Sequence, residues 1–461
     1  MAIDLKETRI DISLSKYDNL KKQLQGGILK SHGRNHTAHL LLRFTAEPKA
    51  VKQWIQTFAR DNLTSTKQQM EDTERFRQTG ESKLFVNFYL SADGYKHLGF
   101  DAGQFEETFR KGMKHRESNN KDPLVSAWEK PYQGTIHALI NLADAKADVV
   151  ESASEKIKAS VTSVAEVLTI ERGLQQRRGG TAIEQFGYVD GRSNPLFLKS
   201  DFDNEPTNVW DPSAPLGLAL AADPLNSSPD AFGSYFVFRK LEQNVKSFNQ
   251  AVKGLAKQLG VNVNEDLAGA MVVGRFRDGT PVTLQPNDGL KAVNDFNYKN
   301  DKNATKCPFH GHIRKANQRG ETPLTSEESE RSRRIVRRGI TYGKRAEGMT
   351  DEPESGVGLL FMCYQADIGH QFEFLMRAWI DNTRFPEGIN IFNIINIFKR
   401  TGDDPLIGQD QDAEQKWRTK WGDKDAERIK INFGGHVQLK GGEYFFSPSV
   451  GFLQSIAVDL P

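Results

Sequence analysis

Hydrophobic and polar positions follow two different periods in the first 170 residues. Apolar side chains either alternate or run together over about four to eight residues, as in strands, or recur every three or four residues, as on one face of a helix. The elements predicted in this way are, in order, a strand at residues 39–44, a helix at 47–60, strands at 83–90 and 135–142, a helix at 144–159 and a strand at 164–170. The order β-α-β-β-α-β is that of a ferredoxin-like domain.

The second half of the chain repeats the start of this pattern. A strand at residues 234–239 is followed by a helix at 242–259, whose apolar side chains recur every three or four positions. Further along we predict a strand at 357–364, a helix at 369–380 and strand-like residues at 444–456. The pattern therefore predicts an α+β fold made of two ferredoxin-like halves with antiparallel sheets.

Proline marks the division between the two halves. Residues 201–230 contain five prolines, which interrupt helices and strands. We therefore predict an N-terminal domain at residues 1–200, a linker at 201–232 and a C-terminal domain at 233–461. Residues 295–334 are polar and basic, and we expect them to form irregular structure around a site.

Composition and charge exclude several classes of protein. The 62 Lys and Arg residues against 60 Asp and Glu give a net charge of +2, which argues against a dedicated nucleic-acid-binding protein. The longest apolar runs, at residues 356–364 and 389–398, are much shorter than the roughly 18 residues of a membrane span. The N-terminus lacks the apolar core of a secretory signal, and two cysteines are too few for a disulfide scaffold. We expect a cytoplasmic protein without a membrane span.

Candidate catalytic chemistry is limited to histidine, aspartate and arginine. The sequence contains no GxxxxGK[ST] phosphate loop, no HExxH zinc motif and no GxSxG nucleophile motif. Asp190 stands close to Gly187 and Gly191, which could expose its carboxylate at a cavity wall or could simply form a tight turn. His310 and His312 lie two residues apart. Either imidazole could be an axial ligand of haem iron, although a single histidine in a loop is more often structural.

Three segments carry a family resemblance. They are GYVDGR at residues 187–192, CPFHGHIRKANQR at 307–319 and RRGITYG at 337–343. In sequence and in order they resemble the dye-decolorizing peroxidase family, and segments at residues 25–34, 358–361 and 404–409 extend the resemblance over nearly the whole chain. Gln318 and Thr341 stand where the family commonly has proline, so the local loop shape there can differ.

The resemblance, which is strongest to the larger cytoplasmic bacterial members, implies a haem b peroxidase whose C-terminal half holds the haem. Such an enzyme reduces hydrogen peroxide through an oxyferryl intermediate. It oxidises bulky aromatic substrates, such as anthraquinone-type dyes and phenols, in single-electron steps. Hydrogen peroxide and aromatic reductants are then the expected partners. The alternative is a haem-binding protein for storage, transfer or sensing that uses the same pocket without efficient turnover.

On the proximal side of the haem, the resemblance assigns roles to three residues. His312 is expected to ligate the iron, with His310 as the alternative ligand. Asp404 is expected to accept a hydrogen bond from the imidazole and so increase its basicity. Arg314 is expected either to pair with a haem propionate, because a guanidinium suits a carboxylate, or to have an exposed or structural role.

On the distal side, the resemblance implies an acid, an arginine and an apolar wall. Asp190 is expected to move a proton between the two peroxide oxygens. Arg337, with Arg338 as the second choice, is expected to stabilise the negative charge that develops as the O–O bond breaks. Leu359 and Phe361 are expected to limit the access of water to the site.

Other histidines and aromatic residues have ordinary structural interpretations. The three histidines of HGRNHTAH at residues 32–39 could be drawn as a metal cluster, but we expect structural histidines at this transition from loop to strand. Tyr342, Tyr364 and Trp379 could carry an oxidising equivalent to the surface. Core packing is the more common role of such residues, and we favour it.

Overall fold

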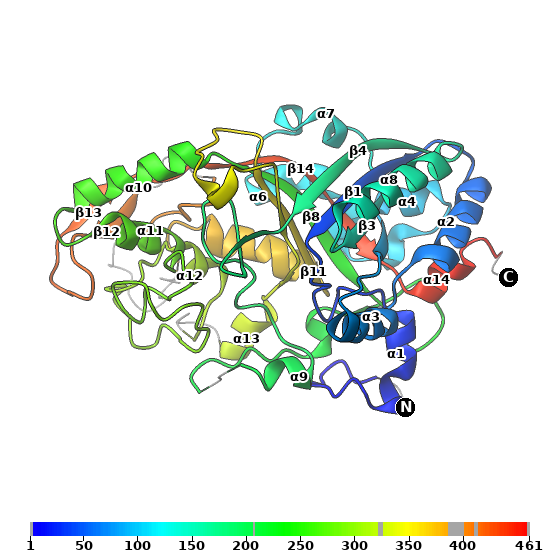
Figure 1. Cartoon of the computed structure of the whole chain (residues 1–461), viewed down its shortest axis with the longest axis horizontal. Coiled ribbons are helices and arrows are strands. Elements are labelled where there is room, and N and C mark those ends of the chain that lie inside the picture. Colours follow the sequence, from blue (N-terminus) through cyan, green and yellow to red (C-terminus); the bar gives the residue numbers. More distant parts are fainter. Residues whose placement is uncertain (1–2, 206–207, 321–325, 386–400, 410–413, 459–461) are drawn as a thin grey trace.

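Two four-stranded antiparallel sheets form the centre of the molecule, seen in the computed structural model in Figure 1. The structure describes residues 3–205, 208–320, 326–385, 401–409 and 414–458. No helix within these ranges is long and apolar enough to cross a membrane. The apolar run predicted at residues 389–398 lies outside the described residues.

The N-terminal half contains the six predicted elements, four strands and two helices. They are β1 (His36–Phe44), α2 (Pro48–Asn62), β2 (Phe85–Leu90), β3 (Ala138–Asp144), α8 (Ala147–Val161) and β4 (Ala165–Leu174). The strand order is β2-β3-β1-β4, so the first strand lies between the third and the fourth, as in a ferredoxin-like domain. The prediction missed α3 (Thr66–Thr79), because this helix is polar on most of its surface and begins at the Ser65 cap rather than at an apolar stripe.

The C-terminal sheet has the same strand order. Its strands are β8 (Phe232–Gln243), β10 (Ile340–Tyr342), β11 (Gly358–Gln365) and β14 (Val437–Ser447), in the order β14-β8-β11-β10. The prediction of two ferredoxin-like halves is therefore confirmed. α10 (Val245–Leu259) follows β8, and the helix predicted at residues 369–380 consists of π-helical turns at Gly369–Glu373 and Leu375–Ile380.

The prediction of strand-like residues at 444–456 is wrong beyond residue 447. There the chain turns into α14 (Val450–Ser455), because the Ser449 hydroxyl accepts a hydrogen bond from the Phe452 N–H and caps a helix. Figure 1 shows α14 beside α2, so the end of the chain covers the N-terminal half.

The two sheets join at both edges and close into a ring of eight strands. Phe446 of β14 pairs with Leu90 of β2, and Tyr342 of β10 pairs with Gly173 of β4. Residue 173 must be glycine at this junction, since a Cβ atom there would lie 2.3 Å from the Thr37 hydroxyl oxygen and 2.5 Å from an Ile340 methyl carbon. Closing the ring removes exposed strand edges.

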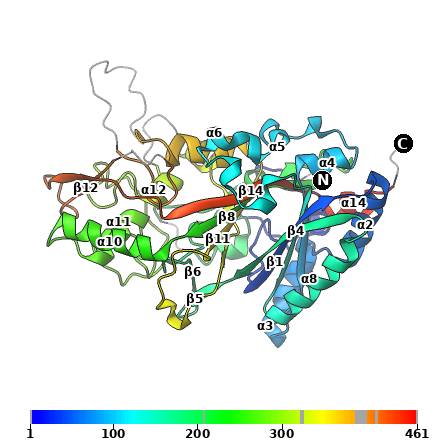
Figure 2. The same cartoon turned by 90° about the horizontal axis from the view of Figure 1, so that it is seen from above.

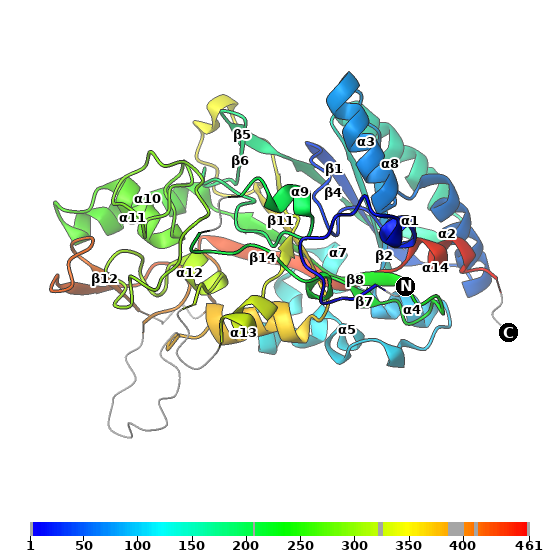
Figure 3. The ribbon, with the colours of Figure 1, turned by 90° about the horizontal axis from the view of Figure 1, so that it is seen from below.

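Shorter elements extend from these sheets. Those on the N-terminal side are α1 (Asp18–Gln23), α4 (Ala92–His97), α5 (Glu107–Lys111), α6 (Glu117–Asn120), α7 (Lys130–Gln133), β5 (Gln176–Arg178), β6 (Thr181–Ile183) and α9 (Lys199–Phe202). Those on the C-terminal side are β7 (Ala221–Ala222), α11 (Glu265–Val273), α12 (His312–Ala316), α13 (Glu327–Ser332), β9 (Val336–Arg337), β12 (Gln415–Arg418) and β13 (Arg428–Ile431). Figures 2 and 3 show α10 and α11 at the opposite end of the molecule from α2 and α8, with α12 between them.

His39 makes the stability of this fold depend on pH. Its imidazole is fully buried in β1, with Nε2 2.9 Å from the Thr37 hydroxyl oxygen. Burial lowers the pKa of His39 to about 3. Histidine in an unfolded chain titrates near pH 6.5, roughly its unperturbed value. Below that pH the unfolded state binds more protons than the folded state, so stability is present above about pH 6.5 and is lost as the pH falls toward 3.

We expect the free energy of unfolding to decrease when the pH is lowered from 7.5 to 5, with His39 contributing about 2 kcal/mol of the decrease. Urea unfolding followed by tryptophan fluorescence at the two pH values measures this change. The variant His39→Gln lacks the titration and should lose about 2 kcal/mol less over the same interval. An equal decrease in the free energy of unfolding of both proteins would show that His39 does not cause this pH dependence.

Candidate active site

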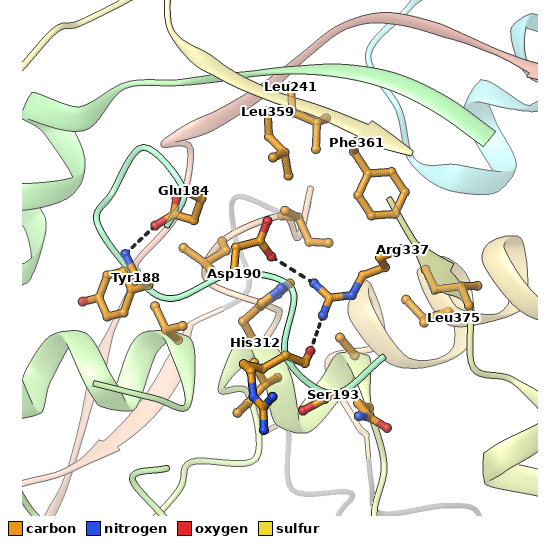
Figure 4. A pocket seen from close by; sticks show the side chains of 18 of the residues that line it. Glu184, Tyr188, Asp190, Ser193, Leu241, His312, Arg337, Leu359, Phe361 and Leu375 are labelled. Atoms are coloured by element: carbon orange, nitrogen blue, oxygen red, sulfur yellow. Dashed lines mark hydrogen bonds and ion pairs between the residues drawn. The ribbon is translucent and has the colours of Figure 1, made fainter. Parts of the chain in front are cut away.

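A cavity of about 240 Å³ lies between the loop at residues 187–192, β11, α12 and the π-helical turns (Figure 4). Asp190, His312, Arg337, Leu359 and Phe361 all line it, so five of the residues singled out in the sequence share one space. Other lining residues include Arg192, Arg275, Arg319, Leu375, Met376 and Ile407. Figure 4 shows the side chains of Asp190, Arg337 and His312 directed toward one another.

Asp190 is held at the cavity wall by a strained loop. Gly187 and Gly191 have φ values of +88° and +78°, which favour glycine, and Ser193 has a φ of +66°. The Asp190 N–H donates to the Ala182 carbonyl at 3.0 Å, and the carboxylate Oδ1 accepts the Gly191 N–H at 2.6 Å. The side chain is 23% exposed, so the carboxylate stays accessible from the cavity.

Arg337 is the partner of this carboxylate. Its Nη1 lies 3.4 Å from Asp190 Oδ1, and its Nη2 donates to the Arg192 carbonyl at 2.6 Å. The neighbouring Arg338, which follows the end of β9, faces away from the cavity. Arg338 is committed to the carbonyls of Gly27 and Ile28, at 2.6 and 2.9 Å, and is absent from the cavity lining.

His312 begins α12 on the opposite wall. Its Nδ1 lies 2.9 Å from Asp404 Oδ2, and the other carboxylate oxygen accepts the N–H groups of Leu406 and Ile407 at 2.8 and 3.1 Å. Burial would raise the pKa of Asp404, but the hydrogen bonds from His312 Nδ1 and from these two N–H groups hold it below its ordinary value. An ionised Asp404 keeps the proton on Nδ1, so Nε2 of His312 carries a lone pair that can bind a metal.

His310 lies in a different environment, although it is only two residues away. Its Nδ1 donates to the Thr401 carbonyl at 3.0 Å, and its ring packs edge-on against Trp417 with centroids 4.3 Å apart. His310 is 1% exposed and does not line the cavity. The geometry therefore favours His312 over His310 as a metal ligand.

Arg314 does not reach the cavity, so its structural role is confirmed and the expected pairing with a haem propionate is corrected. Its side chain is fully buried, with Nη1 3.0 Å from Asp301 Oδ2 and Nη2 donating to the Asp301 carbonyl at 2.9 Å. The guanidinium also packs on the Tyr298 and Phe309 rings. Residues two apart on a helix point in different directions, so Arg314 turns away from the side on which His312 lies.

Two other arginines line the cavity instead, and the sequence prediction missed them. Arg319 donates to the Asn294 and Phe296 carbonyls at 2.8 and 2.7 Å, and Arg275 donates to the Gly279 and Val293 carbonyls, both at 2.7 Å. Both also contact the Ser193 hydroxyl oxygen, at 2.8 and 3.2 Å respectively.

These two guanidiniums carry charge that no carboxylate of the described residues neutralises through an ion pair. Burial lowers the pKa of Arg275 to about 10 and that of Arg319 to about 9. Buried charges are normally paired, so this side of the cavity suits an anionic group. Arg319 belongs to the motif at residues 307–319 and could have been found there, whereas nothing near Arg275 in the sequence marks it.

The aromatic candidates for surface relays are core residues. Tyr342, Tyr364 and Trp379 are 7%, 2% and 5% exposed. The Tyr364 hydroxyl lies 2.7 Å from that of Tyr89 within the hydrophobic core. Their interpretation as core residues is therefore confirmed.

Comparison with known proteins identifies the family. Residues 23–175 match the family described as DyP dimeric alpha+beta barrel domain, and residues 181–393 match the one described as Dyp-type peroxidase, C-terminal. The chain belongs to the DyP-type peroxidase family. The two matches meet between residues 175 and 181, whereas the predicted boundaries at residues 200 and 232 stay predictions.

This DyP-type peroxidase resembles relatives over most of its length. It is 40% identical to the multifunctional dye peroxidase DyP2 of Amycolatopsis sp., over 94% of this chain and 95% of that protein. It is 30% identical to the dye-decolorizing peroxidase msp1 of Mycetinis scorodonius, over 80% of this chain and 76% of that protein. The crystal structure of the Anabaena sp. DyP-type peroxidase has a TM-score of 0.91 at 43% identity and covers 98% of this chain and 99% of its own. The chain is thus a hydrogen-peroxide-dependent oxidoreductase from a family of haem enzymes.

Proposed function

We propose that this DyP-type peroxidase binds haem b in the described cavity and reduces hydrogen peroxide there. One observation carries the proposal: the His312–Asp404 pair and the Asp190–Arg337 pair face each other across the same cavity. Simple haem storage has no need of a carboxylate and a guanidinium opposite the iron ligand. The arrangement therefore favours turnover over the alternative of storage, transfer or sensing.

The residues present fit the chemistry of a haem group. His312 offers an imidazole nitrogen whose tautomer is set by Asp404, which is the usual arrangement of a metal-binding histidine. The guanidiniums of Arg275 and Arg319, which form no ion pair with a carboxylate of the described residues, suit the two propionates. Apolar side chains, among them Leu359 and Phe361, suit the faces of the porphyrin. When bound, the haem iron supplies the redox chemistry of the reaction.

Asp190 and Arg337 would perform the proton transfer and charge stabilisation. The Asp190 carboxylate is placed to accept a proton from one peroxide oxygen and to return it to the other, so that the second oxygen leaves as water. The Arg337 guanidinium, 3.4 Å from that carboxylate, would stabilise negative charge on the leaving oxygen. The backbone N–H of Arg337 donates to Asn194 Oδ1 at 3.0 Å, which fixes the backbone that carries this guanidinium.

Leu359 and Phe361 would exclude water from this region. They are two residues apart in β11 and therefore point to the same face of the strand, toward the cavity. We propose that the reducing substrates are bulky aromatic compounds, such as anthraquinone-type dyes and phenols, which give up one electron at a time. The cytoplasmic location stays a prediction.

The proposal is tested with haem-loaded protein, hydrogen peroxide and an anthraquinone dye. We expect one haem per chain and a dye oxidation rate that depends on, and saturates with, peroxide. A phenol assayed in parallel measures the range of reductants. Stoichiometric haem binding without any peroxide-dependent oxidation would support the storage or sensing alternative, and absence of haem binding would contradict both.

A further inference from the structure

Lys315 is a buried ammonium group close to the proposed iron ligand. It lies three residues after His312 in α12 and is 0% exposed. Its Nζ donates to three backbone carbonyls, those of Trp379 at 3.0 Å, Ile380 at 3.1 Å and Asn382 at 2.9 Å. These three bonds use all the donors of an ammonium group and tie α12 to the end of the π-helical turn Leu375–Ile380.

One carbonyl connects Lys315 to the carboxylate partner of His312. The Ile380 carbonyl accepts a hydrogen bond from Lys315 Nζ and another from the Asp404 N–H, at 3.3 Å. Asp404 in turn holds His312 Nδ1 at 2.9 Å. Hydrogen bonds therefore connect the Lys315 ammonium, through the Ile380 carbonyl, to the backbone of Asp404, whose carboxylate holds the imidazole.

Lys315 carries its charge in this interior without a direct ion pair to any carboxylate that the structure describes. Burial lowers the pKa of Lys315 to about 8, while the charges of Asp403, Asp404 and Asp381 act in the opposite direction. A buried charge acts over several ångströms, because the protein interior screens it much less than water does. Lys315 consequently opposes the negative charge of Asp404.

We propose that Lys315 is a positioning residue for the His312–Asp404 pair and that its charge raises the reduction potential of the bound haem. The proposal rests on the proposed ligation of haem by His312. A positive charge near the iron favours the reduced state, and it also weakens the pull of Asp404 on the His312 Nδ1 proton, so the imidazole donates less electron density. Both effects raise the reduction potential of the haem.

The experiment measures the midpoint potential of the haem-loaded protein by spectroelectrochemistry at pH 7. Lys315→Met and Lys315→Gln remove the charge, and Lys315→Arg keeps it. We expect the two uncharged variants to favour the oxidised state about tenfold more than the wild type, which is a decrease of about 59 mV for one electron. Lys315→Arg should stay near the wild-type potential.

Lys121→Met is the matched control. Lys121 also donates to a backbone carbonyl of this segment, that of Asp381 at 3.0 Å, but it is exposed to solvent, so its charge is screened. Its removal should leave the potential unchanged. Equal shifts in all three Lys315 variants, loss of haem by all three, or no shift in any of them would overturn the proposal. Failure of the wild type to bind haem through His312 would instead contradict the proposed function.

Discussion

Asp190→Asn is expected to lower kcat/KM for hydrogen peroxide by about 10²–10⁴-fold, the usual contribution of a general acid–base group. The amide keeps the size and most of the hydrogen-bonding capacity of the side chain. It cannot accept a proton from one peroxide oxygen and return it to the other. Stopped-flow measurement of the peroxide-induced change in the haem absorption band gives this rate directly, independently of the reducing substrate.

Two controls separate proton transfer from damage to the site. Asp190 and His312 stand on opposite walls of the cavity, so Asp190→Asn should bind haem with the stoichiometry and absorption band of the wild type. Glu205→Gln removes another carboxylate of the same region, one that pairs with Arg192 at 3.0 Å rather than with Arg337, and should retain most of the activity. An Asp190→Asn variant with wild-type kcat/KM would remove this residue from the mechanism.

His312→Ala is expected to weaken haem binding by more than 100-fold. Loss of a partner that only orients a metal ligand costs roughly 10–100-fold in metal affinity, and loss of the ligand itself costs more. By the same reasoning, Asp404→Asn should fall within that 10–100-fold range, because its amide can still contact Nδ1. Titration of the apoprotein with haem, followed by absorption, measures the affinities.

His310→Gln is the matched control for His312→Ala. His310 packs against Trp417 outside the cavity, so its replacement is expected to change stability and to leave the haem absorption band in place. If His310→Gln abolished the band and His312→Ala did not, the proposed ligand would be wrong.

The six elements of the N-terminal half were predictable because each carries its own hydrophobic period. β1 buries a nearly continuous run of side chains, and α2 buries apolar side chains that recur every three or four residues. Both patterns can be recognised in short segments of sequence. α3 lacked this signal, since its polar sequence packs few apolar side chains and its start depends on the Ser65 cap. The end of β14 was also missed, because Ser449 ends the strand and begins a helix within an apolar stretch.

The residue types of the candidate site were predictable from motifs, and their orientations were not. Arg337 and Arg338 are adjacent and chemically identical, yet only Arg337 turns into the cavity. Arg314 shares a motif and a helix with His312 but packs against Asp301 on another side. Arg275 stands in no motif and reaches the cavity only because its segment folds back toward Ser193.

The sequence by itself determined the two ferredoxin-like halves, the family and the residue types to expect at the candidate site, namely an acid, an arginine and an imidazole. Periodicity and motifs are local properties, so they can be read in short segments. Only the tertiary structure decided which groups meet: His312 and Asp404 are 92 residues apart, and Asp190 and Arg337 are 147 apart. Such contacts depend on how the two sheets and their loops pack, and the sequence around either partner contains no record of that packing.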